Sequence, residues 1–399
     1  MLLARLLSKI FKKKGGIVLI DHHGQKYICG NPDLKKPITL KLLNKDLNWK
    51  IILNPDLYFP EAYMRGEIII ENASLYEFLN LTFENLGRDN INVTGTVARQ
   101  IFTFWRFFTN YNLPTKSKKD IKHHYDIGEK FYDLFLDNKH RQYSCAYFKK
   151  PEDTIEEAQQ NKIDHIIKKL SLRPGDRVLD IGCGWGGLAF EIARKSKCEV
   201  TGISLSENQI EYCKRKSKEL KLDNQVNFEL CDYRHVKGQF QRIVSVGAFE
   251  HFGKKFYKTF FNKVKDLMTD DGLALLHTIG SIDAPGPVQP FIQKYIFPGG
   301  LIPSMSDMVK PIEESGLIIS DSETLIRHYD KTLKAWLDRF LENKRKVKEL
   351  YDENFVRMCE FYLASCSAAF KFRDLVVYQL QLVKDFNAIP NNRRDYIYS

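Results

Sequence analysis

The chain has 399 residues, 43% of them hydrophobic, which is a globular composition and more length than one ordinary domain needs. No run of about 18 apolar residues occurs, so the sequence excludes a conventional membrane-spanning helix. The formal charge of +11 and the pI of about 9.0 favour an anionic partner, either nucleic acid or a membrane surface with anionic lipid.

The chain begins with a basic amphipathic segment, residues 1–14. Its apolar side chains recur at helical spacing and are interrupted and followed by Arg5, Lys9 and Lys12–Lys14. A secretory signal would place charge first and a longer apolar stretch after it. Two interpretations stay open: a helix that lies in the interface of an anionic membrane, or a helix packed on its own domain with its basic side in solvent.

Residues 16 to about 110 predict a small α+β domain without a catalytic cluster. Its predicted elements are strands at 17–21, 38–43, 49–55 and 66–71 and a helix at 74–86. An aromatic, helix-like stretch at 98–112 precedes a polar, basic segment that contains Pro114. We therefore expect an accessory, membrane-docking domain at 1–113, a linker at 114–121 and a main domain at 122–399.

The main domain alternates predicted strands and helices from about residue 170. The strands are expected at 177–182, 198–206, 226–232, 240–247 and 272–280, with helices at 188–195, 206–220 and 254–268 between them. This order predicts an α/β fold whose mostly parallel sheet is covered on both faces. Two long helices, at 332–350 and 354–370, precede residues 374–383, whose alternating pattern predicts a half-exposed edge strand.

The cysteines predict thiols and no metal site. None of the eight forms a C-x-x-C pair or a zinc spacing, and His123–His124 has no third ligand at useful spacing. A chain of this length does not need disulfides, so we interpret the cysteines as reduced, mostly buried side chains of a cytosolic protein.

The glycine-rich segment Val178–Gly187 carries the main chemical signal. A buried strand ends in Asp180, and glycines at 182, 184, 186 and 187 follow before a helix begins. Ligands bind beyond the carboxyl ends of such strands, and glycine lets the backbone approach them closely. The spacing is not G-x-G-x-x-G, and Asp180 suits a ligand with an amino group and positive charge.

This segment, with VTGISLSENQ and CDYR after the next two strands, resembles the S-adenosylmethionine loops of class I methyltransferases. The resemblance also rests on five further segments: RQYSCAYF, GAFEHFG, LHTIG, YDKTL and ASCSAAF. Nearly the whole chain resembles the cyclopropane-fatty-acyl-phospholipid synthase family, which is related to the mycolic acid cyclopropane synthases. The resemblance implies a Rossmann-like methyltransferase domain with helical insertions around an acyl site, plus the small N-terminal domain.

The resemblance also implies a set of cofactor-binding residues. Asp180 and the glycines would hold the methionine end, Gln209 would contact the ribose, and Asp232 would meet the adenine amino group. The sequence lacks the acidic residue that many such enzymes carry at the tip of the second strand. The full implied set is Tyr143, Ser144, Asp180, Gly182, Cys183, Gly184, Gly186, Ser204, Leu205, Gln209, Asp232 and Tyr233.

For catalysis, the resemblance implies methyl transfer to the cis double bond of a phospholipid acyl chain. A carbocation would then lose a proton to bound bicarbonate, and a cyclopropane ring would close. The implied catalytic set is Glu250, His277, Tyr329, Cys145, Ile279 and Cys366. Such a reaction needs a dry site, and aromatic side chains such as Phe249 and Phe252 could line it. The resemblance further implies a cytoplasmic homodimer, peripherally attached to the inner face of the membrane.

Several alternatives stay open at this point. Glu250 could cap a helix, His277 could be an ordinary core residue, and Tyr329 could serve packing alone. Cys145 and Cys366 are poor candidates for nucleophiles, because methyl transfer to an alkene needs no covalent enzyme intermediate. A methyltransferase for amines or for acyl chains without ring closure would share the fold, as would a non-enzymatic membrane- or nucleic-acid-binding module. The basic runs lack the stacking aromatics of a recognised nucleic-acid-binding pattern.

Overall fold

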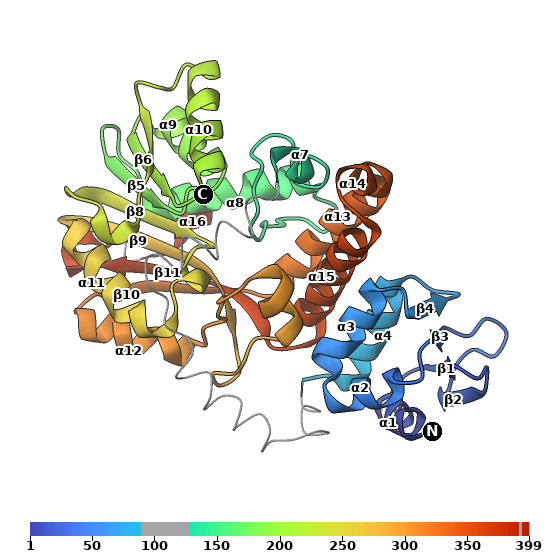
Figure 1. Ribbon diagram of the computed structural model, residues 1–399. Coiled ribbons are helices and arrows are strands. Elements are labelled where there is room, and N and C mark those ends of the chain that lie inside the picture. Colours follow the sequence, from blue (N-terminus) through green and yellow to red (C-terminus); the bar gives the residue numbers. More distant parts are fainter. Residues whose placement is uncertain (89–127, 391–392, 399) are drawn as a thin grey trace. The chain divides into compact units, whose positions relative to one another are not determined.

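The structure, a computed structural model, describes residues 1–88, 128–390 and 393–398 (Figure 1). The described residues form two compact units. Unit one contains 1–88, 287–298 and 330–375, and unit two contains 128–286, 299–329, 376–390 and 393–398. The predicted helix at 98–112, the linker at 114–121 and His123–His124 lie outside the described residues.

Unit one contains a four-stranded sheet with the order β2-β1-β3-β4. The strands are β1 (Gly16–Ile20), β2 (Lys26–Gly30), β3 (Thr39–Leu42) and β4 (Ile68–Glu71). The strands predicted near 17–21, 38–43 and 66–71 are confirmed, whereas the sequence analysis did not find β2. One face of the sheet is the core face, because alternate residues such as Ile17, Leu19, Leu40 and Ile68 are buried.

Helices make up the rest of unit one. They are α1 (Leu2–Ile10), α2 (Leu47–Leu53), α3 (Pro55–Met64), α4 (Leu75–Leu86), η5 (Ile292–Ile296), α13 (His328–Glu342), α14 (Lys344–Leu350) and α15 (Glu353–Phe372), with the first two residues of α13 in unit two. The predicted strand at 49–55 is wrong, because α2 covers most of it. Its run of apolar residues fits either structure, and the buried pair Leu47 and Ile51 has helical spacing.

The amphipathic start of the chain forms α1 and packs on unit one itself. Leu3, Leu7 and Phe11 are buried, whereas Arg5 and the residues 12–14 are exposed. Of the two interpretations of this segment, the structure shows the packed helix with a solvated basic side.

Unit two contains a seven-stranded, mostly parallel sheet, which confirms the predicted fold class. The strands are β5 (Arg177–Ile181), β6 (Glu199–Ser204), β7 (Val226–Leu230), β8 (Phe240–Val246), β9 (Met268–Ser281), β10 (Ile318–Leu325) and β11 (Leu375–Val383), in the order β10-β11-β9-β8-β5-β6-β7. The pairs β5·β6, β6·β7, β5·β8 and β8·β9 are parallel, and β10·β11 is antiparallel. The five strands predicted between 177 and 280 are confirmed.

The predicted edge position of residues 374–383 is wrong. Strand β11 lies between β9 and β10, and eight of its nine residues are buried. The alternating polar residues that suggested an exposed face are Gln379 and Gln381, which find partners inside the protein. The Gln381 amide donates to the Lys169 carbonyl at 2.7 Å and to the Tyr396 hydroxyl at 2.9 Å. The strand at the edge is β10.

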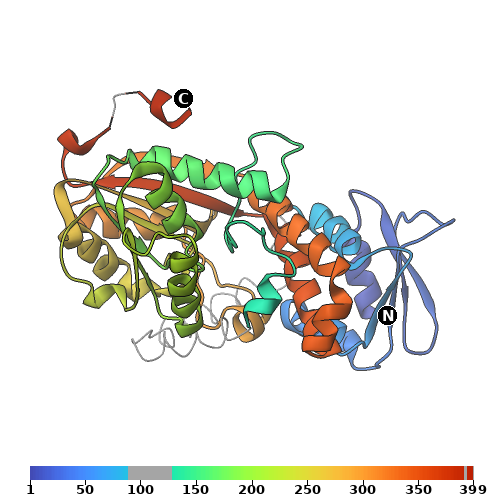
Figure 2. The same cartoon turned by 90° about the horizontal axis from the view of Figure 1, so that it is seen from above.

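Helices cover both faces of this sheet (Figures 1 and 2). The helical elements of unit two are α7 (Glu129–Tyr132), α8 (Ile155–Leu170), α9 (Gly187–Ser196), α10 (Glu207–Glu219), η2 (Tyr233–His235), η3 (Phe249–His251), η4 (Lys254–Phe256), α11 (Tyr257–Leu267), α12 (Met305–Ser315), η6 (Phe386–Ala388) and α16 (Asp395–Tyr398). Side chains of α8, α9 and α10 form one apolar core with Val178 of β5. Side chains of α11 and α12 form a second core with Leu179, the next residue of the same strand, so the two cores lie on opposite faces.

All eight cysteines lie within the described residues and are free thiols; six of them are buried. Among the residues that the structure describes, no helix is both long and apolar enough to span a bilayer.

Candidate functional site

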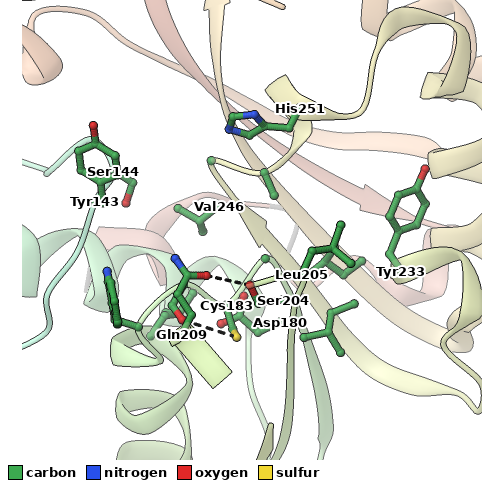
Figure 3. A pocket seen from close by; sticks show the side chains of 18 of the residues that line it. Tyr143, Ser144, Asp180, Cys183, Ser204, Leu205, Gln209, Tyr233, Val246 and His251 are labelled. Carbon is green, nitrogen blue, oxygen red and sulfur yellow. Dashed lines mark hydrogen bonds between the residues drawn. The ribbon is translucent and has the colours of Figure 1, made fainter. Parts of the chain in front are cut away.

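The strand order of unit two creates a crevice at one edge of the sheet. The chain runs from β5 outward through β6 to β7 and then returns to β8, which lies on the other side of β5. At such a reversal the loops after neighbouring strands diverge and leave room for a ligand. A cavity of about 130 Å³ lies there, lined by the segments that follow β5, β6, β7 and β8 and by residues 141–144. In Figure 3, Tyr143 and Ser144 lie on one side of the pocket and Tyr233 on the other.

Eleven of the twelve cofactor-binding candidates line this cavity. They are Tyr143, Ser144, Asp180, Gly182, Cys183, Gly184, Ser204, Leu205, Gln209, Asp232 and Tyr233. The twelfth, Gly186, does not line the cavity and packs against the core instead. A Cβ atom at Gly186 would come within 2.9 Å of the Phe190 ring and 3.0 Å of the Cys213 sulfur. Gly186 therefore lets the loop pack on the core and does not itself face the pocket.

Gly182 is the position where the loop most needs a glycine. Its φ is +83°, and a Cβ atom would lie 2.5 Å from Cβ of Ala248, in the loop after β8. The backbone N–H groups of Gly182 and Cys183 both donate to the Ile203 carbonyl, at 2.9 and 3.0 Å. These contacts hold the ends of β5, β6 and β8 together and leave space for a ligand above them.

Asp180 lies in the wall of the pocket with an unmet hydrogen-bonding capacity. It is buried, and its Oδ2 has no hydrogen-bond partner within the part of the chain that the structure describes. Burial raises the pKa of Asp180 to about 7, and the positive charge of Lys162 opposes that rise. A cationic or amino-bearing ligand would supply the missing partner, so the residues fit the methionine end of S-adenosylmethionine.

Two further pocket-lining groups lack protein partners among the described residues, the indole N–H of Trp185 and the hydroxyl of Tyr233. Buried polar groups of this kind are normally hydrogen-bonded, so unpartnered ones around one cavity indicate a polar ligand. Trp185 was not among the sequence candidates, although it lies inside the glycine-rich segment.

The loop after β6 is organised by its own polar side chains. The Ser204 hydroxyl donates to the Gln209 side-chain oxygen at 2.8 Å, and it accepts from the Ser206 N–H at 3.1 Å. Ser206 in turn caps α10 through the Gln209 N–H. This network fixes Gln209 against the pocket (Figure 3), and both its amide nitrogen and the second lone pair of its oxygen can meet a ribose hydroxyl.

The loop after β7 holds Asp232 in place through Arg234. The guanidinium donates to both carboxylate oxygens, at 2.8 and 2.6 Å. Although burial alone would raise it, these hydrogen bonds hold the pKa of Asp232 below its ordinary value, so the group is ionised at neutral pH. Each carboxylate oxygen can accept more than one hydrogen bond, so Asp232 can still receive an adenine amino group.

The sequence analysis missed several lining residues, among them Arg141, Gln142, Val246 and His251. Arg141 packs its guanidinium over the rings of Trp185 and Tyr212, at 4.9 and 4.4 Å from their centroids. Burial lowers the pKa of His251 to about 4, so its ring is neutral at pH 7. The positions of Arg141, Gln142 and His251 beside Tyr143 and Glu250 in the quoted segments could have indicated them, and Val246 lies at the end of the strand predicted at 240–247.

None of the six catalytic candidates lines this cavity. The structure brings two of them into direct contact: the Glu250 Oε1 accepts from the Ile279 N–H at 2.6 Å. The other oxygen, Oε2, is buried without a partner among the described residues. Burial raises the pKa of Glu250 to about 7, against hydrogen bonds that lower it. Glu250 thus contacts a neighbouring strand and does not act as a helix cap.

Three of the remaining candidates, His277, Cys145 and Tyr329, are buried, whereas Cys366 is partly exposed. His277 accepts at Nδ1 from the Gln379 amide at 3.0 Å, and burial lowers its pKa well below the usual range. This geometry also fits the alternative that His277 is a satisfied core residue. Cys145 and Tyr329 are buried in unit two, whereas Cys366 lies on α15 of unit one.

The segments of Cys145 and Tyr329 are joined by an aromatic stack. The Tyr147 ring lies between His165 and His328, with ring centroids 4.4 and 4.9 Å away and planes within 11° and 6°. The Phe148 N–H also donates to Nδ1 of His328 at 3.1 Å. Of the expected aromatic wall, Phe252 lines the cofactor cavity, whereas Phe249 is fully buried against Tyr257 in the core.

Across residues 1–88, 128–390 and 393–398, no three His, Cys, Asp or Glu side chains gather in a way that could hold a metal ion.

Comparisons with known proteins show that the chain is similar to the members of one family. Residues 113–380 match the family model described as mycolic acid cyclopropane synthetase. The chain is 37% identical over 352 residues to the cyclopropane-fatty-acyl-phospholipid synthase of Escherichia coli K12, covering 86% of this chain and 87% of that protein. It is 38% identical over 286 residues to a probable fatty acid methyltransferase of Pseudomonas putida, covering 69% and 72%.

Solved structures give the same result. The cyclopropane synthase MmaA2 from Mycobacterium tuberculosis matches with a TM-score of 0.63 and 32% identity over 66% of this chain and 97% of that one. Mycolic acid cyclopropane synthase CmaA1, solved in complex with SAH and CTAB, matches with a TM-score of 0.63 and 33% identity over 66% of this chain and 97% of that one.

The cavity predicts a sharp effect of Gly182→Ala on cofactor binding. The added Cβ would press on Ala248 in a pocket-lining loop, and overpacking of this kind costs about 1–3 kcal/mol, so affinity for S-adenosylhomocysteine should fall about 5- to 100-fold in calorimetry. Gly175→Ala is the matched control, because Gly175 has a similar φ of +85° with nothing within 4 Å and does not line the cavity. Equal affinities of the two variants would contradict the placement of the cofactor.

Proposed function

The chain belongs to the mycolic acid cyclopropane synthetase family, and from this we infer that it is an S-adenosylmethionine-dependent cyclopropane-fatty-acyl-phospholipid synthase. It transfers a one-carbon unit to the double bond of an unsaturated acyl chain and forms a cyclopropane ring. The similarity over 86% of the chain to a synthase of this activity is the observation that carries the inference.

The pocket of unit two supports this function through its own residues. When bound, S-adenosylmethionine supplies an electrophilic methyl group on a positively charged sulfur. Asp180 offers a buried carboxyl oxygen without a partner, and Trp185 and Tyr233 offer donors without partners among the described residues. Asp232 and Gln209 are held by Arg234 and Ser204 and so stay oriented before the ligand arrives.

Glu250 and Ile279 form the core of a proposed bicarbonate site. The Ile279 N–H fixes one carboxylate oxygen, so the other is free to accept the O–H of a bicarbonate ion. His277, Tyr329 and the Cys145 backbone would complete the site, and the stack of Tyr147 between His165 and His328 would keep the last two segments together. Cys366 stays a prediction from the family resemblance. A weak base held in a buried site can remove the proton that ring closure releases, without admitting water.

Methylation without ring closure is the second candidate, because the Pseudomonas putida relative bears the name of a fatty acid methyltransferase. The two reactions share the methyl transfer and differ in the fate of the carbocation. Product analysis separates them.

We expect cyclopropane fatty acids when the protein is incubated with labelled S-adenosylmethionine and vesicles of unsaturated phospholipid. Mass spectrometry of the released fatty acids should show a gain of one CH₂ per converted chain, with loss of the double bond. Methyl-branched chains would instead support the second candidate. Label on added amines alone, or no transfer at all, would contradict a lipid-modifying function.

Substituting Glu250 should separate catalysis from cofactor binding. Glu250→Gln replaces a buried charged hydrogen-bonding group, which is worth about 1.5–3 kcal/mol, so turnover should fall at least about 10-fold. Cofactor affinity should stay unchanged, because Glu250 does not line the cofactor cavity. The pH profile is measured at a saturating cofactor concentration and a constant bicarbonate concentration. Wild-type turnover should rise as the pH increases through about 7, because Glu250 becomes charged there, and the variant should not show this rise.

Glu191→Gln is the control for this experiment, since Glu191 is also buried in unit two but pairs with Arg194. A variant at Glu250 with wild-type turnover and pH profile would exclude its role in the reaction.

Unit one is proposed as the part that docks on an anionic membrane. Half of the exposed large apolar side chains of the described residues lie within the first 69 residues. Two of them, Trp49 and Leu53 on α2, are 60% and 78% exposed and are four residues apart, so they share one helix face. Lys45 and Lys50 are close to these residues in the sequence, Lys50 pairs with Asp46 at 3.6 Å, and lysine beside exposed apolar side chains suits a surface of anionic headgroups.

Trp49→Ser combined with Leu53→Ser should weaken binding to anionic vesicles at least about 10-fold, because each apolar side chain loses about 1.5–3 kcal/mol of burial in the bilayer. Binding of the wild type should also fall as salt screens the lysines. Leu220→Ser, an exposed leucine of unit two, is the control. Unchanged co-sedimentation of the double variant would exclude α2 from docking.

A cytoplasmic, peripheral location and a homodimer stay predictions from the resemblance. Fractionation of cells and sedimentation equilibrium test them.

A further inference from the structure

Helix α8 carries a fully buried lysine, Lys162, beside the cofactor cavity. A buried ammonium group loses the hydration of its charge, so it persists only where the protein supplies acceptors and negative charge. Lys162 donates to the side-chain oxygen of Gln142 and to the Ser144 hydroxyl, the latter at 2.9 Å. Both acceptors line the cofactor cavity.

The charged and titratable groups that face Lys162 come from three elements: Asp137 and Cys145 from the segment before α8, Asp180 from β5 and His277 from β9. Asp137 is already engaged, because its two oxygens accept from the backbone N–H groups of His140 and Gln142 at 2.6 and 2.7 Å. The carboxyl group of Asp180 is not engaged in this way, because its Oδ2 has no partner among the described residues. Asp180 also faces the Cys183 thiol. Lys162 is therefore the cation that acts on Asp180.

We propose that Lys162 is a positioning residue of the cofactor pocket: its ammonium group fixes the Gln142 and Ser144 side chains in the pocket wall and supplies the counter-charge of the Asp180 carboxylate. Lys162 itself does not line the cavity, so it acts through these three residues. The proposal depends on the proposed function in one respect, namely that the cavity binds S-adenosylmethionine.

The electrostatics of the cavity agree with this role. Burial lowers the pKa of Lys162 to about 8, and the charges of Asp137, Cys145 and Asp180 oppose that shift. The pKa of Asp180, about 7 with Lys162 present, would be higher without it, because Lys162 is the group that lowers it. A neutral Asp180 would lose its attraction for the amino group of the cofactor. Loss of the lysine charge should therefore weaken cofactor binding most at neutral pH and least at alkaline pH.

Lys169 provides a matched control on the same helix. It is equally buried, but its ammonium group pairs with Glu323 at 2.5 Å and Asp321 at 3.7 Å, and neither acceptor lines the cofactor cavity. Replacing either lysine removes a buried ion and should lower thermal stability. Only replacement of Lys162 should change the pH dependence of cofactor binding.

The experiment measures the affinity of the full-length protein for S-adenosylhomocysteine by calorimetry between about pH 6 and pH 9. This probe keeps the α-amino group and cannot transfer a methyl. For Lys162→Met we expect at least about a 10-fold loss of affinity at pH 7 and a smaller loss at pH 9, which corresponds to an upward shift of at least about one pH unit in the binding profile. Lys162→Arg keeps the charge and should keep the wild-type affinity below about pH 8, where the lysine is also charged, and Lys169→Met should bind like the wild type.

Parallel profiles of Lys162→Met and the wild type, or equal loss in Lys169→Met, would overturn the proposal and leave Lys162 a packing residue. If Lys162→Met does not fold, Lys162→Gln retains a donor for Ser144 without the charge, and it should show the same upward shift. A wild-type protein that binds no S-adenosylhomocysteine would refute the proposed function itself, which is a different result from any change among the variants.

Discussion

Carboxyl groups that are removed from water determine the chemistry of unit two. Asp180 and Glu250 are both buried, and each keeps one oxygen without a hydrogen-bond partner among the described residues. Two other acids show the difference: the buried Asp137 is satisfied by backbone N–H groups, and the partly exposed Glu323 by His165 and Lys169. A fold rarely leaves such groups unmet, because the desolvation of a polar atom is unfavourable. The proposed ligands, the cofactor at Asp180 and bicarbonate at Glu250, would supply partners for these two oxygens.

The general architecture of unit two was predictable because its signals are local. Each strand from β5 to β9 is an apolar run that ends near glycine or a polar residue, and helical patterns follow β5, β6 and β8. The prediction for β11 was wrong because polar residues, which usually indicate exposure, are buried there. Gln379 and Gln381 suggest an exposed face of β11, but both side chains are hydrogen-bonded in the interior, which no periodicity rule shows. The run at α2 was too short for its period to distinguish a helix from a strand.

The cofactor side of the site was largely predictable, since its candidates follow the ends of consecutive parallel strands and must meet at one edge of the sheet. Arg141, Gln142 and Trp185 were not found, because their roles depend on how the segment before α8 folds over the glycine-rich loop. That packing is close: a Cβ atom at Gly187 would lie 2.2 Å from the His140 carbonyl oxygen. The catalytic set was carried by family resemblance, and of its members the geometry directly joins only Glu250 and Ile279.

The position of β11 has a consequence for the synthesis of the protein. This strand follows β9 and β10 in the chain, yet it lies between them and supplies Gln379, the partner of His277. Until β11 has been synthesised, β9 and β10 therefore have no partner between them, and their open edges can pair with other strands. The sheet can close only once β11 has formed. A chain that ended before β11 would thus lack the contact between Gln379 and His277 and would expose strand edges that favour aggregation.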